Sequence, residues 1–354
     1  MRVFGILIAA SVALIFGGFV PVFFASNEIN VPETEQKAAK TKTAIQAECD
    51  LTSAAQMVLS QAQVEDPKSQ SVNGPTLIKV PEWVEDPLAR YYLYFADHHG
   101  EYIRLAYADS PLGPFTIYSG GVLDVASSPL LADHVASPEI FVANGERKIY
   151  LAFHSPDPFD DRRQNSLLAS STDGLVFNLE SALPSGSYLE PEPYVRLFAY
   201  EGMIYQIFPR HGLTFARADS ITGVFEESPQ SLGLEKTRHL SVLTNGNSLE
   251  IYFTTVGDSP ERIKRTTVDL SQPWGTWKAG PVECVRAPEE TWEGATLVPH
   301  PSQSGTALTP VNELRDPFVF VENGVERIYY STAGENGIGV ATVNGTWLES
   351  FASR

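Results

Sequence analysis

Positive charge is scarce in this 354-residue sequence. It holds 25 Lys and Arg residues against 43 Asp and Glu residues, and its formal net charge is −18. Nucleic acids and anionic membranes would repel the average surface of such a chain, so the composition disfavours both as partners. The charged and hydrophobic fractions, 19% and 43%, are typical of a globular protein with a sizeable core.

Cysteine is almost absent, because the chain holds only Cys49 and Cys284. In an oxidising compartment these two would form one disulfide, which would tie the N-terminal arm to the fourth of the repeats described below. Two unpaired, buried thiols are the alternative. The metal-binding spacings HxH, HExxH and CxxC are also missing, so the sequence predicts no contiguous metal motif.

Long hydrophobic runs are limited to one, at the N-terminus. After Met1-Arg2, the uncharged run Val3–Ala25 indicates a cleavable signal peptide, with an uncleaved membrane anchor as the alternative. Either one places the folded part outside the cytoplasm, as a periplasmic, secreted or membrane-anchored protein. We therefore predict a signal or anchor at 1–26, a linker and N-terminal arm at 27–66, and one folded domain at 67–354.

The folded domain is built from repeats of roughly 40–60 residues, a period that suggests propeller blades. Each unit opens with a short strand, turns at Asn-Gly or a similar pair, and continues into a strand rich in Tyr, Phe and Ile. In the last copy the third strand is IGVATV and the fourth, after Asn344-Gly345, is TWLESF. Five four-stranded antiparallel units without helical spacers predict an all-β, five-bladed propeller, with a β-sandwich as the alternative. Four of the copies are ASPEIFVANGERKIYLAFHS (136–155), PYVRLFAYEGMIYQIFPRHG (193–212), LSVLTNGNSLEIYFTTVGDS (240–259) and DPFVFVENGVERIYYSTAGE (316–335).

The direction of the chain in a blade predicts the face on which each segment lies. Inner strands start at one face, the top, and the corners between second and third strands return to it. All histidines fall in such top segments, which marks that face as functional, although some of them could simply fill loops. They are His98, His99, His134, His154, His211, His239 and His300.

The starts of the inner strands carry carboxylates that would converge at the mouth of the channel. Glu139, Glu192 and Asp316 come from different blades, a separation that suits the acid and base of glycoside hydrolysis. Arg315 would keep Asp316 ionised, whereas an enclosed Glu192 could stay protonated as an acid. The alternative is that these acidic residues cap turns or form local ion pairs.

Three sequence segments resemble those of a known family: YADSPLGPF (107–115), SPEIF (137–141) and LRDPFVF (314–320). Over about residues 73–350 the chain resembles glycoside hydrolase family 43 and its wider group of five-bladed propellers, which includes invertases, levansucrases and anhydro-galactosidases. The resemblance implies a base Asp in blade one, a second Asp in blade two and an acid Glu in blade three. Glu192 matches the acid, but Asn73-Gly74 and Ser137 stand where the two Asp residues should be.

The leading prediction is therefore an exported glycoside hydrolase acting on an oligo- or polysaccharide, with Glu192 as general acid and Asp316 or Glu139 as base. No cofactor is required, although the resemblance allows a calcium ion in the channel. The alternatives are a uronate-specific polysaccharide lyase using His, Tyr and Arg, and a propeller that binds sugars without cleaving them. Arginines near the mouth favour an anionic sugar, unless they only neutralise neighbouring carboxylates. The predicted substrate-binding residues are Asn73, His98, His99, His134, His154, Arg196, Arg210, His211, Arg238, His239, Arg315 and Glu293.

Overall fold

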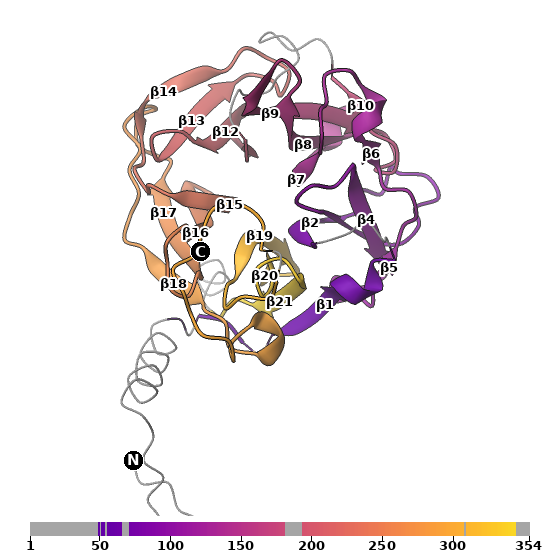
Figure 1. Ribbon diagram of the computed structural model, residues 1–354. Helices are drawn as coiled ribbons and strands as arrows, with labels where there is room; N and C mark the ends of the chain where they lie inside the picture. Colours follow the sequence, from indigo (N-terminus) through magenta and orange to yellow (C-terminus); the bar gives the residue numbers. More distant parts are fainter. Residues whose placement is uncertain are drawn as a thin grey trace, which may run out of the picture. The chain divides into compact units, whose positions relative to one another are not determined.

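The computed structural model describes residues 49, 51–53, 55–65, 71–180, 193–307 and 309–344, and these form five antiparallel sheets around a common axis (Figure 1). The first sheet contains β2 (Asn73–Lys79), β3 (Tyr91–Ala96), β4 (Tyr102–Ala108) and β5 (Thr116–Ile117), with β6 (Leu123–Asp124) also paired to β4. The second contains β7 (Ala136–Ala143), β8 (Lys148–Asp157), β9 (Asp160–Ser171) and β10 (Asn178–Leu179). The third contains β11 (Arg196–Tyr200), β12 (Met203–Pro209), β13 (Leu213–Ala218) and β14 (Glu226–Ser231). The fourth contains β15 (Thr237–Asn245), β16 (Ser248–Thr255), β17 (Ile263–Asp269) and β18 (Glu283–Arg286). The fifth contains β19 (Arg315–Glu322), β20 (Val325–Ser331), β21 (Gly337–Thr342) and β1 (Gln56–Ser60). Short 3-10 helices are η1 (Gln61–Gln63), η2 (Val125–Ser127), η3 (Asn144–Glu146) and η4 (Thr291–Glu293).

The predicted five-bladed propeller is confirmed, but the closure of its fifth blade differs from the prediction. The outer position beside β21, predicted for TWLESF, is occupied by β1 from the N-terminal arm. The propeller therefore includes Gln56–Ser60, which the predicted boundary at residue 67 had left outside it. Since β1 precedes the first blade in the sequence and completes the last, it joins the two ends of the ring. Residues 345–354 lie outside the described residues.

Hydrophobic side chains fill the space between neighbouring blades. The described residues hold five buried apolar clusters, and each of them joins two adjacent blades. Successive residues of a strand point to opposite faces, so Tyr92 and Tyr94 of β3 pack toward the second blade while Leu93 and Phe95 pack toward the fifth. This two-sided burial explains why the strands are apolar runs rather than alternating patterns.

The inner strands surround the channel and begin in unusual backbone geometry. Around the ring, β2, β7, β11, β15 and β19 each contact the next inner strand. At the starts of the first, second, third and fifth of them, φ is +59° at Gly74, +51° at Ser137, +64° at Tyr194 and +50° at Asp316. Left-handed geometry costs a non-glycine residue about 1–3 kcal/mol, and such strain is concentrated at functional sites. Similar geometry also occurs in turns such as Glu201 and Asn323, so the backbone supports the mouth as a candidate site only together with the side chains described below.

The predicted disulfide between Cys49 and Cys284 is present. It links the segment that leads into β1 to β18, the outer strand of the fourth blade. The same segment is bridged to the fifth blade through Thr52 and Val343. The arm that closes the ring is thus fixed to two blades before it pairs with β21.

Removing this disulfide is expected to lower the stability of the propeller by about 2–5 kcal/mol, because a cross-link between residues 235 positions apart restricts the unfolded chain strongly. Urea unfolding of Cys284→Ser under oxidising conditions measures the loss. Cys49→Ser and the double variant should lose the same amount, since each removes the same bond. An unchanged unfolding midpoint in all three would contradict this expectation.

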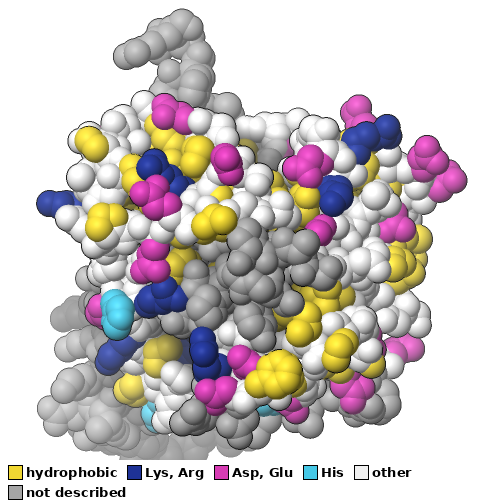
Figure 2. All heavy atoms as spheres, turned by 90° about the horizontal axis from the view of Figure 1, so that it is seen from above, with side chains coloured by type: hydrophobic (Ala, Val, Ile, Leu, Met, Phe, Trp, Pro, Cys, Tyr) yellow, Lys and Arg dark blue, Asp and Glu magenta, His cyan; other side chains and the backbone are white. Residues whose placement is uncertain are grey.

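The predicted signal or anchor and most of the predicted linker lie outside the described residues, so both stay predictions. Among the residues that are described, no helix is long and apolar enough to cross a membrane. The rim of the propeller carries acidic, basic and apolar side chains interspersed with one another, as seen in Figure 2.

Candidate functional site

A small pocket at the mouth of the channel draws side chains from all five blades. The first blade contributes two residues, the second five, and each remaining blade one. We call it the mouth pocket. Its lining residues are Asn73, His98, His134, Ala136, Ser137, His154, Gln164, Tyr194, His239 and Glu335.

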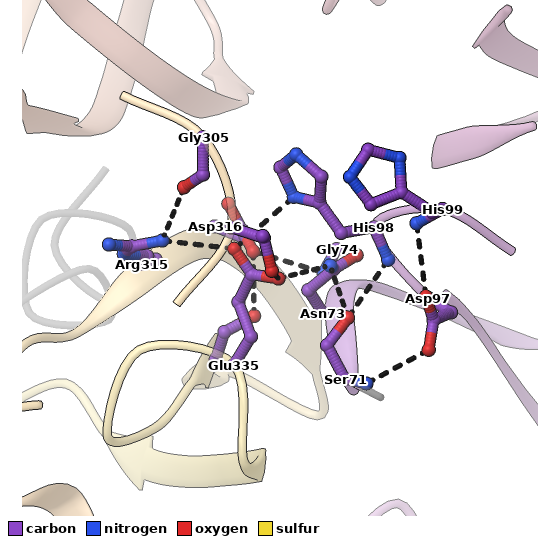
Figure 3. Close-up of polar contacts among 12 residues, drawn as sticks. Ser71, Asn73, Gly74, Asp97, His98, His99, Gly305, Arg315, Asp316 and Glu335 are labelled. Atoms are coloured by element: carbon purple, nitrogen blue, oxygen red, sulfur yellow. Dashed lines mark hydrogen bonds and ion pairs between the residues drawn. The ribbon is translucent and has the colours of Figure 1, made fainter. Parts of the chain in front are cut away.

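Inner-strand starts and the corners between second and third strands position these side chains. In the first blade, the buried carboxylate of Asp97 holds the corner between β3 and β4. Its two oxygens accept hydrogen bonds from the backbone N–H groups of Ser71 (2.9 Å) and His99 (3.0 Å). The corner therefore presents His98 and His99 in a fixed backbone geometry (Figure 3).

Imidazole rings form an arc around the mouth. Successive rings contact one another edge to face, with centroid separations of 4.3–6.0 Å. The order of the rings is His98, His99, His134, His154, Tyr194 and His239. The structure thus brings five of the seven histidines together, whereas His211 and His300 are exposed and do not line the mouth pocket.

At one end of the arc, His239 lies between a carboxylate and a hydroxyl. Its Nδ1 is in direct contact with Oδ1 of Asp316, and its Nε2 lies 3.4 Å from Oγ of Ser137. The second oxygen of Asp316 accepts hydrogen bonds from the backbone N–H of Gly74 (3.2 Å) and the hydroxyl of Ser331 (2.7 Å). These two donors fix the carboxylate beside the imidazole.

The protonation of His239 follows from its surroundings. Burial lowers the pKa of His239 well below its usual value, and the charges of Arg196 and Arg238 lower it further. Contact with the carboxylate of Asp316 acts in the opposite direction. With burial dominant, His239 is neutral near pH 7 and is able to accept a proton.

Among the described residues, Glu335 is the carboxylate that lines the mouth pocket, and it was not one of the predicted site residues. It accepts hydrogen bonds from Asn73 (3.0 Å) and Arg315 (2.9 Å), and one of its oxygens lies 3.3 Å from Nδ1 of His98 (Figure 3). Burial alone would raise the pKa of Glu335, but the hydrogen bond and charge of His98, with the charge of Arg315, lower it to about 2. Glu335 lies at the corner between β20 and β21, so the rule that located the histidines would have found it if applied to acidic residues.

Glu139 does not line the mouth pocket, and it pairs with Arg196 across the second and third blades. The carboxylate lies 3.4 Å from Nε of Arg196, which also donates to the carbonyl of Leu240 (2.8 Å). Burial raises the pKa of Glu139 to about 7, although the charge of Arg196 opposes the change. Neither Glu139 nor Arg196 lines the mouth pocket, and their roles as base and as binding residue stay predictions.

The remaining predicted arginines are also engaged by carboxylates. Arg238 makes two contacts with Glu261 (3.0 and 3.2 Å), and Arg315 makes two with Glu313 (2.8 and 2.6 Å) besides its bond to Glu335. Arg210 pairs with Glu227 at 2.7 Å. These contacts match the alternative that the arginines neutralise neighbouring carboxylates, and an anionic sugar held by them stays a prediction.

Glu293, predicted to contact substrate, is instead a buried structural residue. Its side chain is 0% exposed and accepts two hydrogen bonds from Arg286 (2.8 and 2.9 Å) and one from Tyr330 (2.6 Å). The backbone N–H groups of the two preceding glutamates, Glu289 and Glu290, complete its hydrogen bonding. Glu192, the predicted general acid, lies outside the described residues and stays a prediction.

One set of side chains among the described residues has the spacing of a metal site. The ligand atoms of His99, Asp133 and His134 all lie within 4.8 Å of one another. Two imidazole nitrogens do not fit the channel calcium that the resemblance allowed, because Ca²⁺ prefers six to eight oxygen ligands. The calcium ion therefore gains no support from this set of residues.

The solved structures most useful for comparison are five-bladed propellers of glycoside hydrolase family 43. A GH43_1 enzyme from Xanthomonas citri aligns with a TM-score of 0.57 and 13% identity, covering 87% of this chain and 94% of that one. CoXyl43, a β-xylosidase/α-arabinofuranosidase from a compost metagenome solved with xylotriose, aligns with a TM-score of 0.57 and 14% identity, covering 84% and 96%. At such identities the likeness concerns the fold, and this chain is a five-bladed propeller of the family 43 type.

A sequence relative defines the family more narrowly. The chain is 33% identical over 308 residues to the uncharacterized protein R118 of Acanthamoeba polyphaga mimivirus, a match that covers 78% of this chain and 85% of that protein. The chain belongs to the same family as this viral protein. No family model matches the sequence.

Proposed function

We propose that the protein is a glycoside hydrolase whose active site is the mouth pocket. The observation that carries the proposal is the meeting, in one pocket, of an ionised carboxylate, Glu335, with an imidazole backed by a carboxylate, His239 with Asp316. The fold shared with family 43 enzymes supports a sugar as substrate.

The two groups suit different parts of the reaction. Hydrolysis of a glycosidic bond passes through an oxocarbenium-like transition state, whose positive charge the carboxylate of Glu335 would stabilise. Neutral His239 would accept the proton of the attacking water at Nε2, while Asp316 holds Nδ1. Glu192 remains the predicted donor of a proton to the leaving oxygen.

The arginine contacts favour a neutral sugar over an anionic one. Because the four predicted arginines are paired with carboxylates, the mouth pocket offers no guanidinium that is free of a carboxylate partner among the described residues. The disulfide supports an oxidising, extracytoplasmic compartment. CoXyl43 was solved with xylotriose, so neutral xylo-oligosaccharides are sensible first substrates.

Incubating the full chain with neutral, uronic and sulfated oligosaccharides is expected to give products that gain one water per cleavage, as read by mass spectrometry. Glu192→Gln should lower the rate by about 10²–10⁴-fold, because the leaving oxygen loses its proton donor. Glu227→Gln is the matched control, since the side chain of Glu227 is 50% exposed and does not line the pocket, and it should cleave at the wild-type rate. Full activity in Glu192→Gln would remove Glu192 from the mechanism, and absence of cleavage across the panel would contradict the proposed hydrolase.

A polysaccharide lyase is the second candidate, and the position of Tyr194 favours it. The Tyr194 ring lies 4.3 Å from that of His239 and 4.8 Å from that of His154, so a phenol and two imidazoles meet in the pocket. Such groups exchange protons in uronate elimination. Unsaturated products without added water, detected by their ultraviolet absorbance and mass, would establish the lyase and exclude hydrolysis.

A further inference from the structure

We propose that His99, Asp133 and His134 form a binding site for a divalent transition metal of the zinc type, at the rim of the mouth pocket. The three side chains come from two segments, the corner after β3 and the connection that leads into β7. His134 also lines the mouth pocket, so the site adjoins it. The proposal concerns metal binding alone and holds whichever reaction the pocket performs.

The two segments are fixed to each other by the backbone. The N–H of Val135 donates to the carbonyl of Gly100 (3.0 Å), which joins the connection to the histidine corner directly beside the proposed ligands. On the other side, Ser155 Oγ accepts from the N–H of Ala132 and donates to its carbonyl, both at 3.1 Å. The ligands are therefore held on anchored backbone, which limits the rearrangement that a metal ion would require.

The side chains are already directed at one another. Oδ2 of Asp133 lies 2.8 Å from Nδ1 of His134, and the rings of His99 and His134 contact with centroids 5.4 Å apart. Asp133 is 73% exposed at its side chain and His134 is 7% exposed, so one ligand faces solvent and another is enclosed. An ion could therefore enter from solvent and still be bound by a buried imidazole.

His154 supplies an independent indication of a ligand near this site. Its ring contacts that of His134 with centroids 6.0 Å apart, and its side chain is buried. Nδ1 of His154 has no hydrogen-bond partner within the described part of the chain. A buried nitrogen without a partner is costly, and a bound ion or its water would satisfy it.

The donor set selects the class of metal. Two imidazoles and one carboxylate are typical of zinc sites that keep a further coordination position for water or substrate. Calcium and magnesium prefer oxygen ligands, so we expect neither to compete at similar concentrations. At the pocket rim, the open position would be available to water or to a sugar oxygen.

The test is calorimetric titration of the chelator-treated full chain with ZnCl₂. The amount of zinc bound per chain is measured by inductively coupled plasma mass spectrometry. We expect one zinc per chain for the wild type, and a loss of affinity greater than about 100-fold in His99→Ala, since losing a residue that merely orients a ligand already costs about 10–100-fold. Asp133→Asn should also weaken binding, and it should fold as the wild type does because the side chain of Asp133 is exposed. His211→Ala and His300→Ala, which change exposed histidines outside the site, should bind as the wild type does.

Cobalt provides a second readout that does not depend on activity. Co²⁺ in place of zinc should give visible absorption bands of four- or five-coordinate geometry in the wild type, and these bands should be lost in His99→Ala. Unfolding curves recorded in chelator establish that each variant is folded. The proposal is overturned if the wild type takes up no stoichiometric zinc, or if His99→Ala and Asp133→Asn bind it as tightly as the His211→Ala control.

Discussion

Glu293→Gln is expected to destabilise the propeller by about 3 kcal/mol, because it removes the buried counter-charge of Arg286 and leaves only the partly exposed carboxylate of Glu289, 3.4 Å away. Both side chains are 0% exposed, and the two hydrogen bonds between them measure 2.8 and 2.9 Å. The hydroxyl of Tyr330 and two backbone N–H groups also donate to the same carboxylate. Glutamine keeps the shape of the side chain but removes its charge. Its amide NH₂ group would also face the groups that donate hydrogen bonds to the carboxylate in the wild type.

Urea unfolding at neutral pH measures this loss, and Glu227→Gln is the matched control. Glu227 pairs with Arg210 at 2.7 Å, a shorter contact than either bond of the buried pair, but its side chain is 50% exposed. An exposed pair contributes about 0–1 kcal/mol, so this control should unfold close to the wild type. Equal losses of unfolding free energy in the two variants would show that burial does not determine how much the Arg286–Glu293 pair contributes to stability.

The fold could be predicted because its signals are local and repeated. Each hairpin carries its own turn pair, and Glu201-Gly202 and Asn323-Gly324 adopt the left-handed geometry that tight hairpins require, with φ of 48° and 79° and of 52° and 73°. The closing strand β1 has no such local signal. It is five residues long and pairs with β21, about 280 positions later, so only the finished ring shows its partner.

The site was partly predictable for the same reason. The direction of the chain in a blade placed His98, His154 and His239 at the mouth without knowledge of any contact. The ion-pair partners of charged side chains could not be predicted in this way, because Arg238 contacts Glu261 and Arg315 contacts Glu335 only in the folded chain. Glu293 illustrates the limit, since an acidic residue beside a Trp has the same sequence pattern in a binding site as in a core.

Asp316→Asn is expected to lower kcat/KM for glycoside cleavage by about 10²–10⁴-fold while leaving KM nearly unchanged. Gly74 N–H and Ser331 O–H both donate to Oδ2 of Asp316, so the amide oxygen of an asparagine would take that place. Its NH₂ group would then face Nδ1 of His239, which must become the acceptor. The imidazole proton moves to Nε2, and the nitrogen that should accept a proton from water already carries one.

Asp316 acts here as a positioning residue, so the pH profile separates its effect from simple damage to the pocket. In the wild type, the acid limb of kcat/KM reports the protonation of His239, and it should lie below the usual range of a histidine because burial lowers the pKa of that residue. Asp316→Asn should remove this limb together with the rate. Ser331→Ala, which deletes one of the two donors and leaves the charge in place, should lose less than about tenfold. If Ser331→Ala lost as much as Asp316→Asn, the effect would come from the shape of the pocket mouth rather than from the tautomer of His239.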